Sequence, residues 1–303
     1  MQKLLHICAI FLVTGLVGCV SPMQTPEENK INGDLLQKQI SQLDKSKMLD
    51  ITTSKIENAS DKSLLKTKGI YLGIALDGAS PAFEGDIKRV EELLFSKITT
   101  GPSLILSNYT ANAHIYPRAD LITIPIAAKA VGDFVLNKPV KQPTLAVVNI
   151  SAHGKTNLLH KRVGTYREQS QLTGEYLQKI LLDVDSSNTT PMLLIISACY
   201  SGSLIPILSA PNRIIITASA SDRNSFGCGS TSKNTVFTQF LLDKEINVNL
   251  SLYEFFAAAL KRITDHENEK KYTNSLPQIF IGEKMQKLYQ APINKWHEVL
   301  TLQ

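Results

Sequence analysis

The sequence predicts an α/β fold in which helices cover both faces of a mostly parallel β-sheet. Two observations lead to this class. Short runs rich in Val, Ile and Leu recur along the chain, and uninterrupted apolar runs are typical of parallel strands buried on both faces. Amphipathic segments with helical spacing separate these runs, and this alternation indicates strand–helix–strand units.

The expected elements follow one another along the chain. The first strand is predicted at Ile70–Leu76, and after a glycine-containing loop a helix is predicted from Glu84 to Ile98. Further strands are expected at Thr144–Ile150, Met192–Ala198, Arg213–Ala218 and Pro277–Ile281, and further helices at Thr173–Leu182, Thr235–Leu242 and Ser251–Arg262. A short helix is expected after the strand at 192–198. In open parallel sheets, ligands bind at the carboxyl ends of the strands.

Composition supports a globular protein. The chain has 303 residues, of which 43% are hydrophobic and 19% charged, enough for a full hydrophobic core. The net charge is +5, but Lys and Arg are spread along the chain rather than gathered into a basic run or a basic–aromatic stripe. Nucleic acid is therefore not expected as a partner.

The first residues read as a targeting segment. Lys3 precedes an apolar stretch from Leu4 to Val17, which is too short to span a bilayer comfortably. The stretch ends in Leu-Val-Gly-Cys19, which resembles the lipobox of bacterial lipoproteins and implies a signal peptide over 1–18 and a diacylated Cys19. The alternative is an ordinary signal peptide that contains a Cys. Two acyl chains give stable anchoring, and Val20 after the Cys favours the outer membrane.

Three further regions follow the signal peptide. Residues 19–68 are expected to form a polar tether that carries the lipidated Cys and one amphipathic helix, with apolar residues at helical spacing: Ile31, Leu35, Leu36, Ile40 and Leu43. That helix is expected to serve packing. Residues 69–290 form the predicted folded domain, and residues 291–303 a C-terminal tail.

Targeting changes the count of available thiols. Of the four cysteines, Cys8 leaves with the signal peptide and Cys19 carries lipid, which leaves Cys199 and Cys228. In an oxidising compartment this pair could instead form one structural disulfide.

Two predicted strands end in nearly the same way. Val-Val-Asn-Ile-Ser-Ala-His153-Gly154 and Leu-Leu-Ile-Ile-Ser-Ala-Cys199-Tyr-Ser-Gly each break into a glycine turn. If the strands are parallel neighbours, an imidazole and a thiol meet at one edge of the sheet. Taken singly, a strand-end His is more often a packed residue and a strand-end Cys more often a small buried hydrophobe. Their occurrence together favours a cysteine nucleophile.

The surrounding residues suit that chemistry. A free thiol has a pKa of about 8.5, so a neighbouring base that takes the proton, or the N-terminus of a following helix, increases the thiolate fraction. Gly154 leaves space for a backbone N–H to approach a substrate oxygen. Together with the N–H of Cys199 it would form an oxyanion hole, which lowers a barrier by about 3 kcal/mol.

These motifs resemble the caspase-like cysteine peptidases, in which a His precedes the Cys. The stretch Ala-Cys199-Tyr-Ser-Gly-Ser is similar to the legumain family, and residues 216–228 resemble those of its bacterial members. The resemblance covers about residues 69–287. It implies a caspase-type three-layer α/β/α sandwich, with His153 as general base and Cys199 as nucleophile.

The sequence also departs from the legumain pattern. The family has an acidic residue two positions before the Cys, where it lines the substrate pocket, and this chain has Ser197. An arginine expected after the first strand has no counterpart, so asparagine specificity is not implied. Asp77 and Asp222 remain candidates for substrate contact, although Asp222 could simply pair with Arg223. Asp86 reads as a substrate contact or an ordinary charge in the first helical turn.

The leading hypothesis is a lipid-anchored cysteine endopeptidase of the bacterial envelope that faces the periplasm and acts on peptides or proteins. A transpeptidase with the same acyl-enzyme and a non-catalytic interaction lipoprotein are the alternatives. No cofactor is expected. His114, His160, His266 and His297 lack ligand spacing, so no metal is expected either. The oligomeric state is not predicted.

Overall fold

The computed structural model describes residues 25–56, 67–136, 144–161, 170–185, 189–242 and 246–302. In these residues the central feature is a seven-stranded sheet with the strand order β10-β9-β8-β4-β1-β2, in which β3 also pairs with β1. Its strands are β1 (Thr67–Ala75), β2 (Thr99–Thr100), β3 (Ser103–Ser107), β4 (Thr144–Ser151), β8 (Met192–Ser197), β9 (Arg213–Thr217) and β10 (Gln278–Ile281). Every pairing is parallel except that of β10 with β9.

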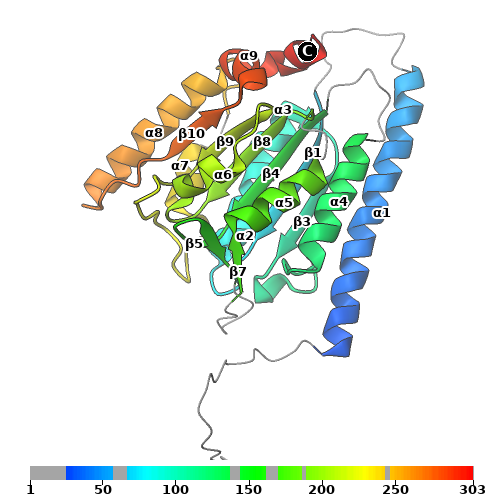
Figure 1. Cartoon of the computed structure of the whole chain (residues 1–303), viewed down its shortest axis with the longest axis horizontal. Helices are drawn as coiled ribbons and strands as arrows, with labels where there is room; N and C mark the ends of the chain where they lie inside the picture. The colour runs from blue at the N-terminus through cyan, green and yellow to red at the C-terminus, as the bar shows by residue number, and fades with distance from the viewer. Residues whose placement is uncertain are drawn as a thin grey trace, which may run out of the picture.

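Helices cover both faces of this sheet (Figure 1). One face carries α4 (Thr123–Leu136), α5 (Gly174–Val184) and α6 (Ile205–Leu208), and α1 (Pro26–Ile56) lies at the edge of the sheet beside β3 and α4 (Figure 1). The other carries α2 (Pro81–Val90), α3 (Ser96–Ile98), α7 (Val236–Leu241) and α8 (Leu252–Glu269). A π-helical segment, Glu91–Phe95, joins α2 to α3. The predicted α/β/α sandwich with a mostly parallel sheet is confirmed.

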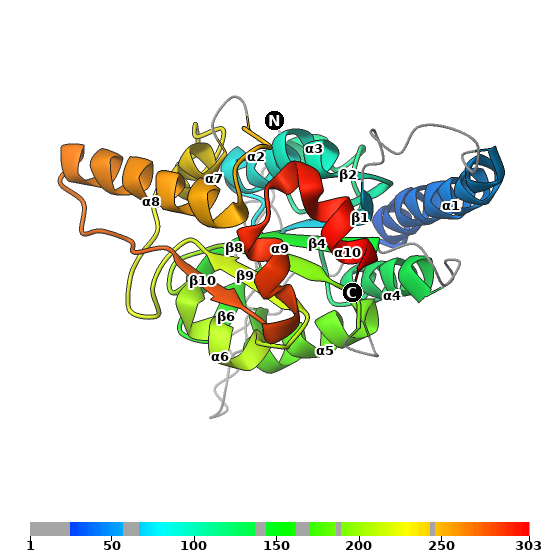
Figure 2. The same cartoon turned by 90° about the horizontal axis from the view of Figure 1, so that it is seen from above.

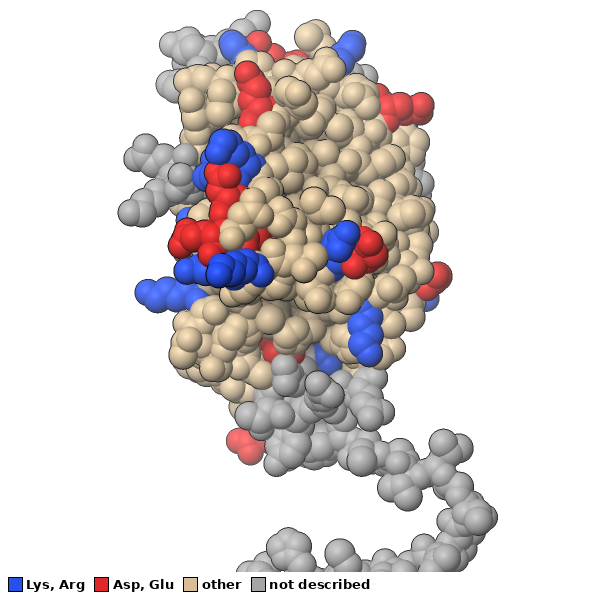
Figure 3. All heavy atoms as spheres, turned by 90° about the vertical axis from the view of Figure 1, so that its left-hand side faces the viewer, with Lys and Arg blue, Asp and Glu red and all other residues tan. Residues whose placement is uncertain are grey.

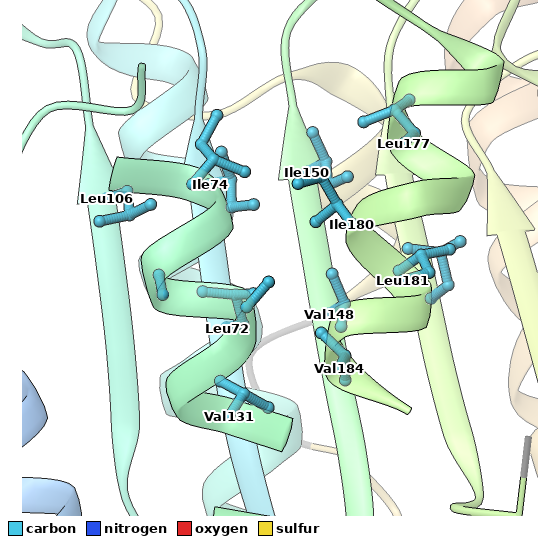
Figure 4. Close-up of a cluster of buried hydrophobic side chains, with 14 of the residues drawn as sticks. Leu72, Ile74, Leu106, Val131, Val148, Ile150, Leu177, Ile180, Leu181 and Val184 are labelled. Carbon is cyan, nitrogen blue, oxygen red and sulfur yellow. The ribbon is translucent and has the colours of Figure 1, made fainter. Parts of the chain in front are cut away.

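Burial explains why the strands are apolar without interruption. Every residue of β4, β8 and β9 is buried, because helices pack on both sides. Figure 4 shows one of the two cores, in which Val148 and Ile150 of β4 face Ile180 and Val184 of α5. Burial of side chains of this kind stabilises a fold by about 1.5–3 kcal/mol each.

Helix starts are fixed by local capping. The helix predicted from Glu84 begins earlier, at Pro81, because Ser80 caps it and proline suits the first helical position. Thr173 and Thr235 cap α5 and α7 through their side chains. Ser251 and Glu254 form a reciprocal capping box at the start of α8.

Helix α1, which lies in the predicted tether region, packs on the domain. Leu36 and Leu43 are buried in the same core as α4. The Gln39 amide donates to the Ile105 carbonyl (3.1 Å) and accepts from the Ile105 N–H (3.0 Å), so this helix satisfies backbone groups of the outer strand β3. The predicted signal peptide, the predicted lipidation site Cys19 and residues 57–66 lie outside the described residues.

The C-terminal region closes the opposite end of the sheet. Helices α9 (Gln286–Gln290) and α10 (Trp296–Thr301) lie across the amino ends of the strands when the molecule is seen from above (Figure 2). The segment predicted as a tail thus contains α10, and Trp296 is fully buried. On the side shown in Figure 3, Lys and Arg side chains lie among Asp and Glu side chains.

A small three-stranded antiparallel sheet stands at the carboxyl edge. It consists of β5 (His153–Lys155), β6 (Leu158–His160) and β7 (Gln171–Thr173). A single residue, Ala152, separates the end of β4 from the start of β5. The predicted His153 is therefore the first residue of a second strand that turns away from the central sheet.

Candidate active site

His153 and Cys199 follow neighbouring parallel strands. Ser151 pairs in register with Ser197, and His153 and Cys199 each stand two residues further on. The Ala152 N–H donates to the Ser197 carbonyl at 3.0 Å, which keeps the two chains together past the end of the sheet. The structure thus brings the predicted pair to one edge, as the matching strand ends predict.

Both side chains line one small cavity of about 10 Å³. A cavity of this size holds about one water molecule. Its lining is mainly apolar or hydroxylic: Phe83, Ala152, His153, Ser197, Ala198, Cys199, Ser225, Phe226, Cys228 and Thr235.

The His153 ring is held on two sides. Phe83 packs edge-on against it, with ring centroids 5.0 Å apart and an interplanar angle of 70°. Its Nε2 lies 3.9 Å from Oδ2 of Asp77, a side chain that is 1% exposed. Asp77 also accepts a hydrogen bond from the Ala79 N–H (2.9 Å). The geometry therefore places Asp77, predicted as a substrate contact, beside the imidazole.

The sulfur of Cys199 is engaged by the backbone of Ser225. The Ser225 N–H donates to Sγ at 3.2 Å, and the thiol donates to the Ser225 carbonyl at 3.4 Å. These two contacts hold the sulfur against the loop that contains Ser225.

The turn after Cys199 is compact. Tyr200 adopts a left-handed conformation (φ 57°), and its N–H donates to the Arg223 carbonyl at 2.7 Å. Only a 3-10 turn, Ser201–Leu204, and the four-residue α6 follow. The helix dipole predicted to act on Cys199 is therefore small, because a helix dipole is the sum over aligned peptide units and these segments contain few of them.

Gly154 stands where no side chain fits. A Cβ at this position would lie 2.2 Å from the carbonyl oxygen of Cys199 and 3.1 Å from the Ala198 side chain. The chain after His153 therefore approaches the backbone of the nucleophile closely, as a shared oxyanion hole requires. The roles of the Gly154 and Cys199 N–H groups remain a prediction.

A buried carboxylate lies beneath the cavity. Asp86 is fully buried and accepts hydrogen bonds from Ser151 Oγ (2.8 Å), Thr235 N–H (2.9 Å) and Thr235 Oγ1 (2.8 Å). The Ser197 hydroxyl lies 2.9 Å from Thr235 Oγ1. Burial raises the pKa of Asp86, and the hydrogen bonds from Ser151 and Thr235 oppose that rise. Asp86 thus joins both strand ends to the segment before α7.

The sequence alone predicts a substrate contact or an ordinary first-turn helix charge for Asp86, and the structure shows a buried hydrogen-bond acceptor instead. A signal for burial was present, because Ala82, Phe83, Ile87 and Val90 recur at helical spacing and Asp86 shares their face. Its partners are 65 and 149 residues away along the chain, so local patterns do not reveal them.

The remaining candidates lie in different surroundings. Ser197 lines the cavity, but it is buried and its hydroxyl contacts Thr235. The Asp222 side chain is 73% exposed and lies 3.7 Å from Arg223, outside the cavity lining. Cys228 lines the cavity together with Cys199, and neither forms a disulfide. Among the described residues, no group of three or more His, Cys, Asp or Glu is arranged to hold a metal ion.

Fold and site together define an α/β/α protein with a His and a Cys at adjacent strand ends. Residues 140–287 match the sequence model of the Peptidase C13 family. The matched region includes His153, Cys199 and strands β4 to β10, and the match confirms the predicted resemblance to legumain-like cysteine peptidases.

Similarity to curated proteins and to solved structures is more limited. No curated protein matches the sequence. Among solved structures, the chain is similar to caspase-1 from Spodoptera frugiperda at 12% identity and a TM-score of 0.46, over 72% of this chain and 86% of that one. Within the described residues, no helix combines the length and the apolar character needed to cross a membrane.

Proposed function

We propose that this protein is a cysteine endopeptidase that uses His153 and Cys199 as a catalytic pair and forms a thioester acyl-enzyme. One observation carries the proposal. The two side chains follow register-paired strands and line a single cavity within the region that matches the peptidase family.

In the acylation step, His153 takes the proton of the Cys199 thiol while Sγ attacks the carbonyl carbon of the scissile bond. The N–H groups of Gly154 and Cys199 stabilise the resulting oxyanion. As the C–N bond breaks, His153 gives its proton to the departing amine, and the acyl group stays on sulfur as a thioester.

In the deacylation step, a water molecule takes the place of the amine. His153 accepts a proton from this water as its oxygen attacks the thioester carbon. Collapse of the second tetrahedral intermediate breaks the C–S bond, releases the carboxylic acid and returns the proton to the thiol.

Asp77 and Phe83 hold the imidazole ring of the general base, His153, in position. With Nε2 turned toward Asp77, Nδ1 is the ring nitrogen that exchanges a proton with the thiol. A carboxylate beside the imidazole also stabilises the imidazolium that forms during acylation. In this mechanism Asp77 orients the His153 ring and does not contact the substrate.

The sequence supports a location at the bacterial cell envelope. The Leu-Val-Gly-Cys19 pattern favours a lipid anchor on the outer membrane, with the domain in the periplasm and peptides or proteins as substrates. The chemistry uses only protein side chains and backbone, and it requires no cofactor.

A peptide library provides the test. Wild type should cleave members of the library, Cys199→Ala should cleave none, and Cys228→Ala, the matched control from the same cavity, should retain cleavage. Free carboxylic acids formed in the presence of an added amine indicate hydrolysis, whereas amide products indicate transpeptidation. Equal cleavage by wild type and Cys199→Ala would contradict the proposal.

A further inference from the structure

Four exposed aliphatic side chains gather where α1 and α4 begin. They are Ile31 (48% exposed), Leu121 (49%), Ile122 (73%) and Ile126 (41%), here called the α1–α4 patch. Single exposed aliphatic residues are common on proteins, whereas contiguous groups of them are typical of interaction surfaces.

The two segments that carry the patch are fixed to each other. The Asn32 side chain donates to Asp120 Oδ2 (3.3 Å) and accepts from the Arg118 N–H. Arg118 also lies 3.3 Å from Glu28. Ile31 and Leu121 are the chain neighbours of Asn32 and Asp120, so the patch belongs to one corner of the domain.

This corner lies at the same edge of the sheet as the candidate active site. The Asn108 side chain donates to the carbonyls of Ala119 and Leu76, both at 3.0 Å. Ala119 stands two residues before Leu121, and Leu76 directly precedes Asp77, which contacts His153. Figure 1 agrees, since the N-terminal end of α1 and strand β5, which begins with His153, lie at the same lower end of the molecule.

The lipid anchor proposed for Cys19 lies close to this corner along the chain. Thr25 caps α1, because its N–H donates to Glu28 and its hydroxyl accepts from the Glu28 N–H. Thr25 follows Cys19 by six positions, and a fully extended chain over these positions spans at most about 22 Å. Ile31 follows about 9 Å further along the helix. A bilayer that holds the lipid on Cys19 is therefore within reach of the patch.

From these positions we infer that the α1–α4 patch rests on the lipid bilayer, so that the edge with His153 and Cys199 faces the membrane surface. The inference rests on the proposed lipid anchor. The partner of the patch is a bilayer, because the proposed anchor holds one next to this corner and aliphatic side chains insert into its interface. The substrate class that follows is peptide segments close to the membrane surface.

Fluorescence quenching in vesicles tests the contact. The full lipidated chain with Ile122→Trp is reconstituted into phosphatidylethanolamine–phosphatidylglycerol vesicles that contain brominated lipids. The chain has one natural tryptophan, the fully buried Trp296, and it serves as an internal reference. The matched control is Leu182→Trp, which is 38% exposed on the last turn of α5, away from the patch. We expect quenching at Ile122→Trp to exceed that of the control at least threefold, and equal quenching would overturn the inference.

Activity gives a second readout. In the double variant Leu121→Ser/Ile122→Ser, cleavage of a lipid-tethered peptide should fall about tenfold, because the apolar contact is weakened. Cleavage of the same peptide free in solution should not change, since neither residue lines the cavity. An equal effect on both peptides would contradict the inference.

Failure of this inference and failure of the proposed function are distinguishable. If the chain sediments with vesicles and cleaves free peptides but shows no excess quenching at Ile122→Trp, the membrane contact is wrong and the peptidase assignment stands. If the chain does not sediment with vesicles, the anchor and the membrane contact are both wrong, whereas hydrolysis by Cys199 is judged separately. If it is quenched as expected but cleaves no peptide, the catalytic proposal alone is wrong.

Discussion

Replacing Asp86 by Ala removes the carboxylate that joins β4 to the segment before α7. Three donors lose their partner: the Ser151 hydroxyl, the Thr235 N–H and the Thr235 hydroxyl. A buried donor left without a partner costs about 1–3 kcal/mol, so the loss for the three together is about 3–9 kcal/mol. The free energy of unfolding of a whole domain is about 5–15 kcal/mol, and the variant should be severely destabilised.

Asp86→Asn separates the hydrogen bonds from the charge. The amide oxygen can still accept from the Thr235 N–H, and the buried charge disappears, so we expect a loss of only about 1–2 kcal/mol. The pH dependence changes as well. Because burial raises the folded-state pKa above its ordinary value of 3.8, the folded state binds more protons than the unfolded state between these two pKa values. The free energy of unfolding of wild type therefore decreases as the pH rises from the ordinary pKa of Asp86 to its raised folded-state pKa. Asp86→Asn should not show this decrease.

Urea unfolding followed by Trp296 fluorescence measures these differences, because this single tryptophan is fully buried. The matched control is Asp133→Ala, an exposed carboxylate beside Lys129, which should change the free energy of unfolding by less than about 0.5 kcal/mol. Equal stability of Asp86→Ala and Asp86→Asn, or a loss of unfolding free energy in Asp86→Ala no larger than in the control, would contradict a structural role for the Asp86 carboxylate.

Three further changes probe the site itself. Gly154→Ala places a Cβ 2.2 Å from the Cys199 carbonyl oxygen. The backbone shift of about 1 Å that relieves this clash should lower kcat/KM about 100-fold. Unchanged kinetics would show that catalysis does not need the close approach of the Gly154 and Cys199 backbones. Asp77→Ala should lower kcat with little change in KM, because Asp77 contacts His153; a rise in KM alone would restore the predicted substrate contact. Cys228→Ser should keep kcat/KM within about threefold of wild type, and a loss like that of Cys199→Ala would give this second thiol a direct part in the chemistry.

Strands buried on both faces were the most predictable part of the fold. The runs at β4, β8 and β9 stand out because no residue in them reaches solvent. Helix α4 was not predicted, since apolar residues occupy its exposed side as well, Ile126 among them, and this blurs the helical pattern. The antiparallel direction of β10 has no signal in the sequence, because strand direction follows from how α8 returns the chain to the sheet.

The predictable residues of the site are likewise those that local sequence determines, whereas contacts between distant residues could not be predicted. His153, Gly154 and Cys199 were predicted from strand ends that each carry their own turn, and the parallel register then aligns them. The contact of Ser225 with the sulfur joins residues 26 apart, through a loop with no regular periodicity. Ser197, which departs from the family pattern, turned out to contact Thr235 beneath the cavity, a pairing that only the folded chain creates.

Labelling of Cys199 with a thiol-reactive acyl probe tests the central claim most directly. The labelled residue is identified by peptide mapping, and Cys228, which lines the same cavity, is the internal comparison. If His153 is the base, wild type should react selectively at Cys199 and His153→Ala should lose at least about 100-fold in labelling rate. Labelling of Cys199 at the rate of an ordinary free cysteine, unchanged by His153→Ala, would contradict the catalytic pair.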